Sequence, residues 1–112
     1  MTKEELTAWA LASGWSMVSG MPSLLKPGKS EAVVRMVLKG TVVNIEAKKP
    51  AGKWEKIAGE AYNQVMADPI DGTPLGLGFE KIPGFGMLMR ENKDRNIFGK
   101  APAKAAPRNP WG

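Results

Sequence analysis

The sequence contains no cysteine and no histidine. Without thiols the chain cannot form a disulfide framework, a thiolate zinc site or a cysteine nucleophile. Without imidazole it also lacks the commonest metal ligand and the side chain that most often moves protons near neutral pH. Reaction classes that depend on these groups are excluded, and we expect neither a cofactor nor a bound metal ion.

Long apolar runs are also lacking. The opening residues, MTKEELTAWALASGW, include two acidic side chains and no uninterrupted apolar stretch. They predict neither a secretion signal nor a membrane-spanning segment. We therefore expect a cytoplasmic protein that makes no contact with a membrane.

The composition is that of one globular domain with a modest core. The chain has 112 residues, of which 43% are hydrophobic and 24% charged, and its 13 glycines and 9 prolines predict many turns. Charge is distributed unevenly, because residues 1–92 carry eleven basic and ten acidic side chains, whereas residues 93–112 carry five and one. We expect a single domain over residues 1–92 and a basic, Pro- and Ala-rich flexible tail over residues 93–112.

Residues 2–14 predict a short amphipathic helix. Thr2 can cap the first turn, and Glu5, three residues later, completes a capping box. Gly14 can end the helix in a left-handed conformation. Apolar and small side chains recur at helical spacing, and we expect this stripe to face a sheet with Trp9 in the core. The stripe consists of Leu6, Trp9, Ala10 and Ser13.

Later segments alternate between apolar and polar residues, as β-strands do. The clearest is a hairpin, in which two strands rich in β-branched residues flank a turn at Gly40. Residues 60–67 fit either a short helix or a last strand. We predict an α+β fold, with the N-terminal helix packed on a mostly antiparallel sheet of about four to five strands, followed by an irregular C-terminal segment. The expected strands cover residues 15–18, 23–26, 31–39, 41–49 and 53–58.

A two-residue turn at Gly40 and Thr41 sets the register of this hairpin, and it pairs Arg35 with Glu46. One face of the hairpin is then polar and the other apolar, so the sheet should be solvated on one side and packed on the other. The polar set is Arg35, Lys39, Asn44, Glu46 and Lys48, and the apolar set is Ala32, Val34, Met36, Leu38, Val43, Ile45 and Ala47.

The segment after residue 68 is rich in glycine and proline, and its glycines are best explained as turns. A short helix fits residues 85–92. The side chains of Met87, Leu88 and Met89 form a soft apolar cluster there, which favours packing in the core. Met87 and Met89 are also the residues through which a protein partner would be contacted.

Residues 44–50, with the sequence NIEAKKP, place Glu46 and Lys48 two apart on a predicted strand, so that both side chains share one face. This Glu-x-Lys pattern resembles the metal-binding strand of the PD-(D/E)XK nuclease superfamily. The resemblance implies that Glu46 binds magnesium and that Lys48 orients the attacking water. The superfamily also has an acidic ligand on the preceding strand, where this chain offers only Glu31. Cross-strand pairing of Glu46 with Arg35 is the alternative interpretation.

Basic side chains and one tryptophan gather on the predicted polar face and the strand beside it. Such a surface can follow phosphates and stack a base. The basic tail can contribute further charge, and its tryptophan can enter a partner's pocket. The candidate binding residues are Arg35, Lys39, Lys48, Lys53 and Trp54 in the sheet and Lys100, Lys104, Arg108 and Trp111 in the tail.

These observations predict a non-catalytic binding or adaptor module whose partner is nucleic acid or an acidic protein surface. Two alternatives remain open. One is a metal-dependent nuclease that uses Glu46 and Lys48 with Glu31, and the other is a protein–protein adaptor in a phage or bacterial assembly that binds through Trp111 or Met87. A solvated surface without a partner explains the same basic residues. The sequence leaves the oligomeric state open.

Overall fold

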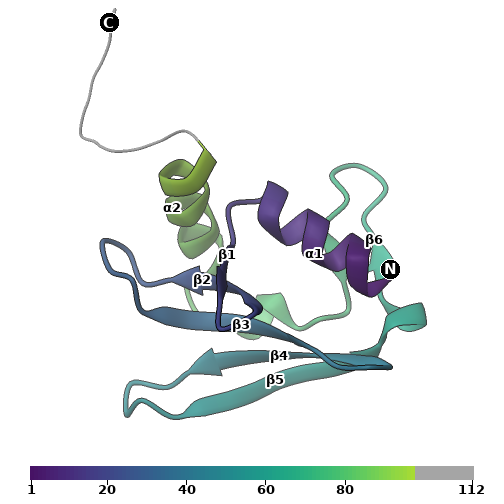
Figure 1. The fold of residues 1–112 in the computed structure, drawn as a ribbon, viewed down its shortest axis with the longest axis horizontal. Helices are drawn as coiled ribbons and strands as arrows, with labels where there is room; N and C mark the ends of the chain where they lie inside the picture. Colours follow the sequence, from purple (N-terminus) through teal and green to yellow (C-terminus); the bar gives the residue numbers. More distant parts are fainter. Residues whose placement is uncertain (98–112) are drawn as a thin grey trace, which may run out of the picture.

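A computed structural model describes residues 1–97 of the chain. Five consecutive strands form one antiparallel sheet in the order β1 to β5. Helix α1 (Lys3–Ala12) precedes the sheet and helix α2 (Phe85–Ile97) follows it (Figure 1). The predicted α+β fold is therefore confirmed. The strands are β1 (Ser16–Val18), β2 (Met21–Leu25), β3 (Ala32–Leu38), β4 (Val42–Lys48) and β5 (Trp54–Ala61).

The connection between β5 and α2 contains only short elements. Residues 60–67, which fitted either a helix or a strand, form neither alone. β5 ends at Ala61, and a 3-10 turn and a two-residue strand follow it. The short elements are the 3-10 turns η1 (Tyr62–Gln64) and η2 (Phe79–Lys81) and the two-residue strands β6 (Met66–Ala67) and β7 (Pro74–Leu75), which pair as a small hairpin.

Both helices and the β5–α2 connection lie on one side of the sheet (Figure 1). The core is on this side, where Val34, Met36, Val43 and Ile45 are at most 1% exposed. Because successive strand residues point to opposite faces, the intervening residues of β3 and β4 point away from the helices. No element within residues 1–97 covers that second face. The sheet is therefore packed on one side and open on the other, as the alternation predicts.

Helix α1 begins with the predicted capping box. The Thr2 hydroxyl accepts a hydrogen bond from the Glu5 amide at 3.0 Å, and the Glu5 carboxylate accepts one from the Thr2 amide at 2.8 Å. Leu6 and Ala10 are fully buried against the sheet. The helix is thus held by caps at its start and by an apolar stripe along its length.

Four aromatic rings join distant parts of the chain. Phe79 and Phe85 stack with their centroids 4.6 Å apart, and Trp9 stacks on Phe79 at 5.9 Å. Trp15 approaches Trp9 at 5.8 Å. The aromatic cluster of Trp9, Trp15, Phe79 and Phe85 therefore ties α1 to η2 and α2, and Trp9 packs against the core as predicted.

Helix α2 starts at Phe85, as the sequence indicates, but it ends at Ile97 rather than near residue 92. Residues 93–97, expected in the tail, are therefore helical. The side chain of Asn96 explains why the helix continues. Its Nδ2 donates hydrogen bonds to the Gly14 carbonyl at 2.6 Å and to the Ser16 hydroxyl at 2.9 Å. These contacts hold the last turn of α2 against the link between α1 and β1.

The apolar cluster on α2 is only partly packed. Leu88 and Met89 pack against the core, whereas Met87 is 65% exposed, so the expectation that Met87 packs is wrong. Residues 85, 88, 89 and 92 recur at helical spacing on the inner side of α2, and Met87 lies outside that stripe. Within residues 1–97 neither helix is long and apolar enough to cross a membrane.

Candidate functional site

The register of the β3–β4 hairpin is the predicted one. Arg35 lies opposite Glu46, and Val37 lies opposite Asn44. On β5, Trp54 lies opposite Lys48. Arg35, Lys48 and Trp54 therefore reach the open face from three neighbouring strands.

Trp54 is the centre of this face. The guanidinium carbon of Arg35 lies 3.9 Å from the centroid of the Trp54 ring, and the Lys48 ammonium nitrogen lies 5.9 Å from it. Both distances allow attraction between a cation and an aromatic ring, which is stronger at the shorter one. We call Arg35, Lys48 and Trp54 the platform. The structure thus brings together three of the five candidate residues of the sheet.

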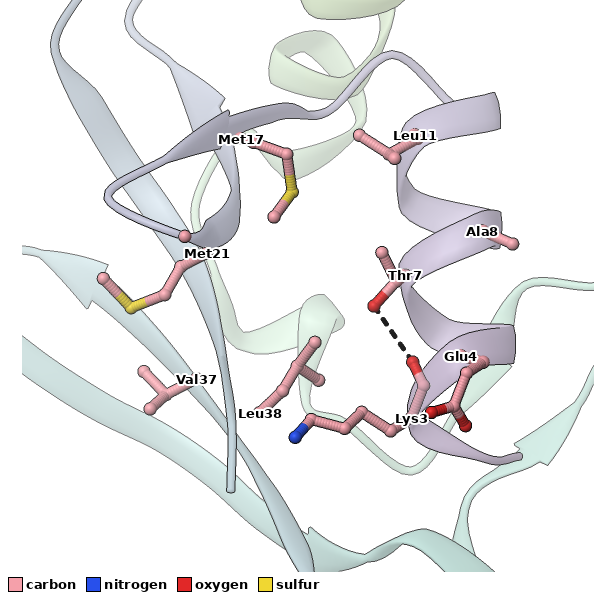
Figure 2. Close-up of a pocket in the computed structure, with 10 residues that line it drawn as sticks. Lys3, Glu4, Thr7, Ala8, Leu11, Met17, Met21, Val37 and Leu38 are labelled. Carbon is pink, nitrogen blue, oxygen red and sulfur yellow. Dashed lines mark hydrogen bonds between the residues drawn. The ribbon is translucent and has the colours of Figure 1, made fainter. Parts of the chain in front are cut away.

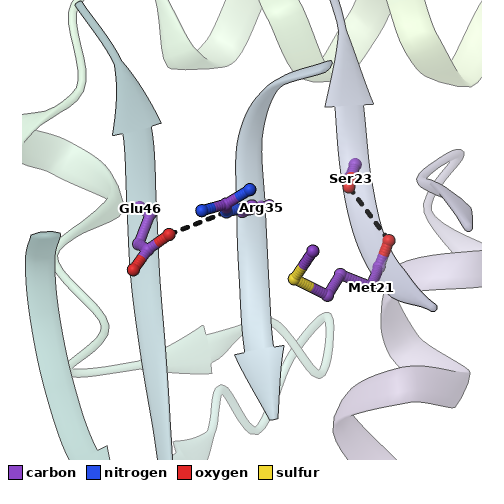
Figure 3. Close-up of polar contacts among 4 residues, drawn as sticks. All are labelled: Met21, Ser23, Arg35 and Glu46. Atoms are coloured by element: carbon purple, nitrogen blue, oxygen red, sulfur yellow. Dashed lines mark hydrogen bonds and ion pairs between the residues drawn. The ribbon is translucent and has the colours of Figure 1, made fainter. Parts of the chain in front are cut away.

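Each cation of the platform also has a carboxylate partner. Arg35 Nε lies 2.7 Å from Glu46 Oε1 (Figure 3), and Lys48 Nζ lies 3.0 Å from Glu31 Oε2. The hydrogen bond and charge of Lys48 lower the pKa of Glu31. Exposed ion pairs of this kind contribute little to stability, but these two orient the cations beside the ring.

Two lysines without a carboxylate partner lie next to platform residues along the strands. Lys53 and Lys56 are exposed, one directly before Trp54 and the other opposite Glu46. No ion pair within residues 1–97 involves either of them, whereas the neighbouring Lys49 lies 3.9 Å from Glu55. The sequence places Lys56 among the basic residues around Trp54, but the list of candidate binding residues leaves it out, although its spacing of two from Trp54 puts both side chains on one face.

Asn44 lies on the open face but is only 8% exposed, so its predicted solvation is wrong. The cause is the neighbouring strand, where Gly59 lies opposite Asn44. A Cβ at Gly59 would come within 2.6 Å of Asn44 Oδ1 and 2.8 Å of Lys56 Cε. The Lys56 stem and the Asn44 amide therefore occupy the space that the glycine leaves free.

The polar face ends at β2. Ser23 lies opposite Arg35 but is only 1% exposed. Its hydroxyl donates to the Met21 carbonyl at 2.9 Å, within its own strand (Figure 3). This hydroxyl is satisfied inside β2, and the groups that can meet a ligand come from β3, β4 and β5.

Lys39 lies at the far end of the hairpin from Trp54, and the structure does not bring it into the platform. Its backbone carbonyl accepts a hydrogen bond from the Tyr62 hydroxyl. Burial raises the pKa of Tyr62 above its ordinary value of 10.0, and the charge of Glu4 adds to the effect. Tyr62 therefore stabilises the fold below the pKa of the unfolded chain, and this contribution is lost as pH rises through the higher folded value.

Because Tyr62 is the single tyrosine of the chain, tyrosinate absorbance reports on this residue alone. We expect the folded protein to titrate above 10.0, with the same chain in denaturant as the control. A folded midpoint equal to or below the denatured one would show that the hydroxyl is not held at the hairpin.

The acidic residues of the nuclease interpretation are divided between two ion pairs. Glu46 contacts Arg35, and Glu31 contacts Lys48. Across residues 1–97, no group of three or more acidic, histidine or cysteine side chains is placed to hold a metal ion. The nuclease interpretation stays a prediction.

The tail candidates Lys100, Lys104, Arg108 and Trp111 lie outside the described residues. Comparisons of the chain with protein-family models, curated protein sequences and solved structures gave no significant match. The function must therefore be inferred from the chemistry of the chain itself.

Proposed function

We propose that the protein is a non-catalytic binding module that contacts nucleic acid through the open face of β3, β4 and β5. The observation that carries the proposal is the position of Trp54 beside Arg35 and Lys48 on that face. Sheets that bind single-stranded nucleic acid combine aromatic rings, on which bases stack, with cations that contact phosphates. The platform offers both groups within one surface.

The cations of the open face can bind phosphate, because their ion pairs with carboxylates are weak or absent. The Lys48–Glu31 pair is exposed enough, at 26% and 48% of the two side chains, for Lys48 to exchange Glu31 for a phosphate at little cost. Lys53 and Lys56 need not release a partner. If about four cations contact phosphates, the logarithm of affinity should fall with the logarithm of salt concentration with a slope of about −3 for single strands.

Single strands should bind better than duplexes. A base must leave its stack before it can meet an aromatic ring on a protein surface, which costs a few kcal/mol in a duplex and less in a single strand. Trp54 lies on a sheet face, and no helix among residues 1–97 lies on that face to enter a groove of a duplex. We therefore expect sequence-tolerant binding to unpaired DNA or RNA.

Fluorescence anisotropy of labelled single- and double-stranded DNA and RNA at two salt concentrations tests the proposal. Trp54→Ala should weaken single-strand binding about tenfold, because stacking of one base is worth about 1–3 kcal/mol. Lys53→Ala and Lys56→Ala should each reduce the salt slope by about one. Lys81→Ala, which removes an exposed lysine of η2 on the helix-covered side, is the matched control and should change neither quantity.

Other outcomes would favour the other functions. If no probe binds at low salt, or Trp54→Ala behaves like Lys81→Ala, this face is not a nucleic-acid surface. Binding of a protein that resists salt and depends on Met87 would support an adaptor. Shortening of the probe only with magnesium, and its loss in Glu46→Ala, would support the nuclease.

A further inference from the structure

A groove lies between α1 and the start of the sheet, away from the Trp54 ring. Its volume is about 730 Å³, within the usual range for a site that holds a small organic group. One wall is α1, and the other is the β1–β2 turn with β3 beneath it (Figure 2). Leu11 and Met17 face each other across the opening, and Leu38 points toward α1 from the sheet side, whereas the Met21 and Val37 side chains at its edge point away from the helix.

The groove is apolar and open. Leu11 is 44% exposed and Met17 is 49% exposed, although both are large hydrophobic residues. The charged side chains of the lining are Lys3 and Glu4, which have opposite signs. Methionine adapts its shape to a partner and makes favourable contacts between sulfur and aromatic rings. The lining therefore fits an aromatic side chain better than it fits a phosphate or a cation.

The end of the described chain lies close to this groove. Asn96, in the last turn of α2, donates to the Ser16 hydroxyl at 2.9 Å, and Met17 of the groove directly follows Ser16. Residues 98–112 continue from that point. Their reach is ample, because fourteen residues can span up to roughly 45 Å when extended. The segment has two large apolar side chains, Phe98 and Trp111. Trp111 can therefore reach the groove.

We propose that the C-terminal segment of the same chain docks in this groove, with the Trp111 indole between Leu11, Met17 and Leu38. An indole buries a large apolar area, and here it would cover side chains that are otherwise exposed to water. Docking within one chain needs little intrinsic affinity, since a covalent link raises the effective concentration to the order of 1 mM. The proposal does not depend on nucleic-acid binding.

Methyl NMR of full-length protein labelled at its methionines tests this docking without any nucleic acid. Trp111→Ala should shift the Met17 methyl resonance, because the ring current of the indole is lost. The Met87 resonance should stay in place, since Met87 is exposed on α2, outside the groove. An unchanged Met36 resonance, from a fully buried core residue, would confirm that the variant is folded. Trp54→Phe is the control variant and should leave the Met17 methyl resonance unmoved.

Two results would overturn the proposal. If Met17 does not respond to Trp111→Ala while Met36 is unchanged, the indole is not in the groove. If the response disappears on dilution, the segment docks on a second copy of the chain and the intramolecular assignment is wrong. Loss of nucleic-acid binding, with the methyl shifts intact, would contradict only the function proposed for the sheet face.

Discussion

Gly14→Ala should lower the free energy of unfolding by about 3–5 kcal/mol, among the largest effects of a single substitution. Gly14 has a φ of 100°, a conformation that costs a residue with a Cβ about 1–2 kcal/mol. The new Cβ would also lie 2.5 Å from Lys93 Cα and 2.7 Å from Lys93 N. Both are backbone atoms of α2, so the whole helix must move and the Asn96 hydrogen bond to Gly14 would be strained or lost.

Urea unfolding followed by circular dichroism measures this effect. Gly40→Ala is the matched control, because its φ is not positive and a Cβ added there would meet no atom within 4 Å. We expect that variant to be neutral or stabilised by up to about 1 kcal/mol, since alanine restricts the unfolded chain. Equal stability of the two variants would show that α2 does not rest against the α1–β1 link.

Asn92→Ala should lower the free energy of unfolding by about 3 kcal/mol. The side chain is 1% exposed, and its Oδ1 accepts a hydrogen bond from the Leu25 amide at 2.8 Å while its Nδ2 donates to the Leu25 carbonyl at 3.0 Å. β1 pairs with β2 only as far as Ser16 opposite Ser23, so Asn92 takes the place of a strand beyond that point. Alanine would leave both backbone groups of Leu25 buried without a partner, at about 1–3 kcal/mol each.

The same unfolding experiment applies, with Asn63→Ala as the control. Asn63 is exposed in η1, and its substitution should change stability by no more than about 0.5 kcal/mol. Hydrogen exchange gives a second readout, because the Leu25 amide should lose its protection in Asn92→Ala. An amide that stays protected would mean that another group bonds it.

The parts of the fold that local patterns determine were predicted well. The capping box at Thr2 and Glu5 depends on residues three apart, and the pairing of Arg35 with Glu46 follows from alternation and a short turn. The length of α2 could not be predicted in this way. Its last turn depends on contacts of Asn96 with residues about 80 positions earlier, whereas its basic composition is typical of a tail.

The candidate site shows the same division. The alternation of β3 and β4 placed Arg35 and Lys48 on one face, but the contact between Arg35 and Trp54 depends on the register of β5. That register shifts between Ile45 and Glu46, and a bulge of this kind has no clear sequence signal here. The groove beside α1 was missed because its walls come from four separate elements, α1, β1, β2 and β3.

The alternation along β3 has a consequence for how this protein can change during evolution. Val34 and Met36 are buried in the core, while Arg35, between them, points to the open face. Substitutions at the outward positions alter the ligand chemistry of the surface and leave the packed positions untouched, so their effects on stability should be small, and only those at outward residues in contact, such as Arg35 and Glu46, should depend on one another. Descendants of this chain could therefore acquire different binding partners while they inherit the same fold.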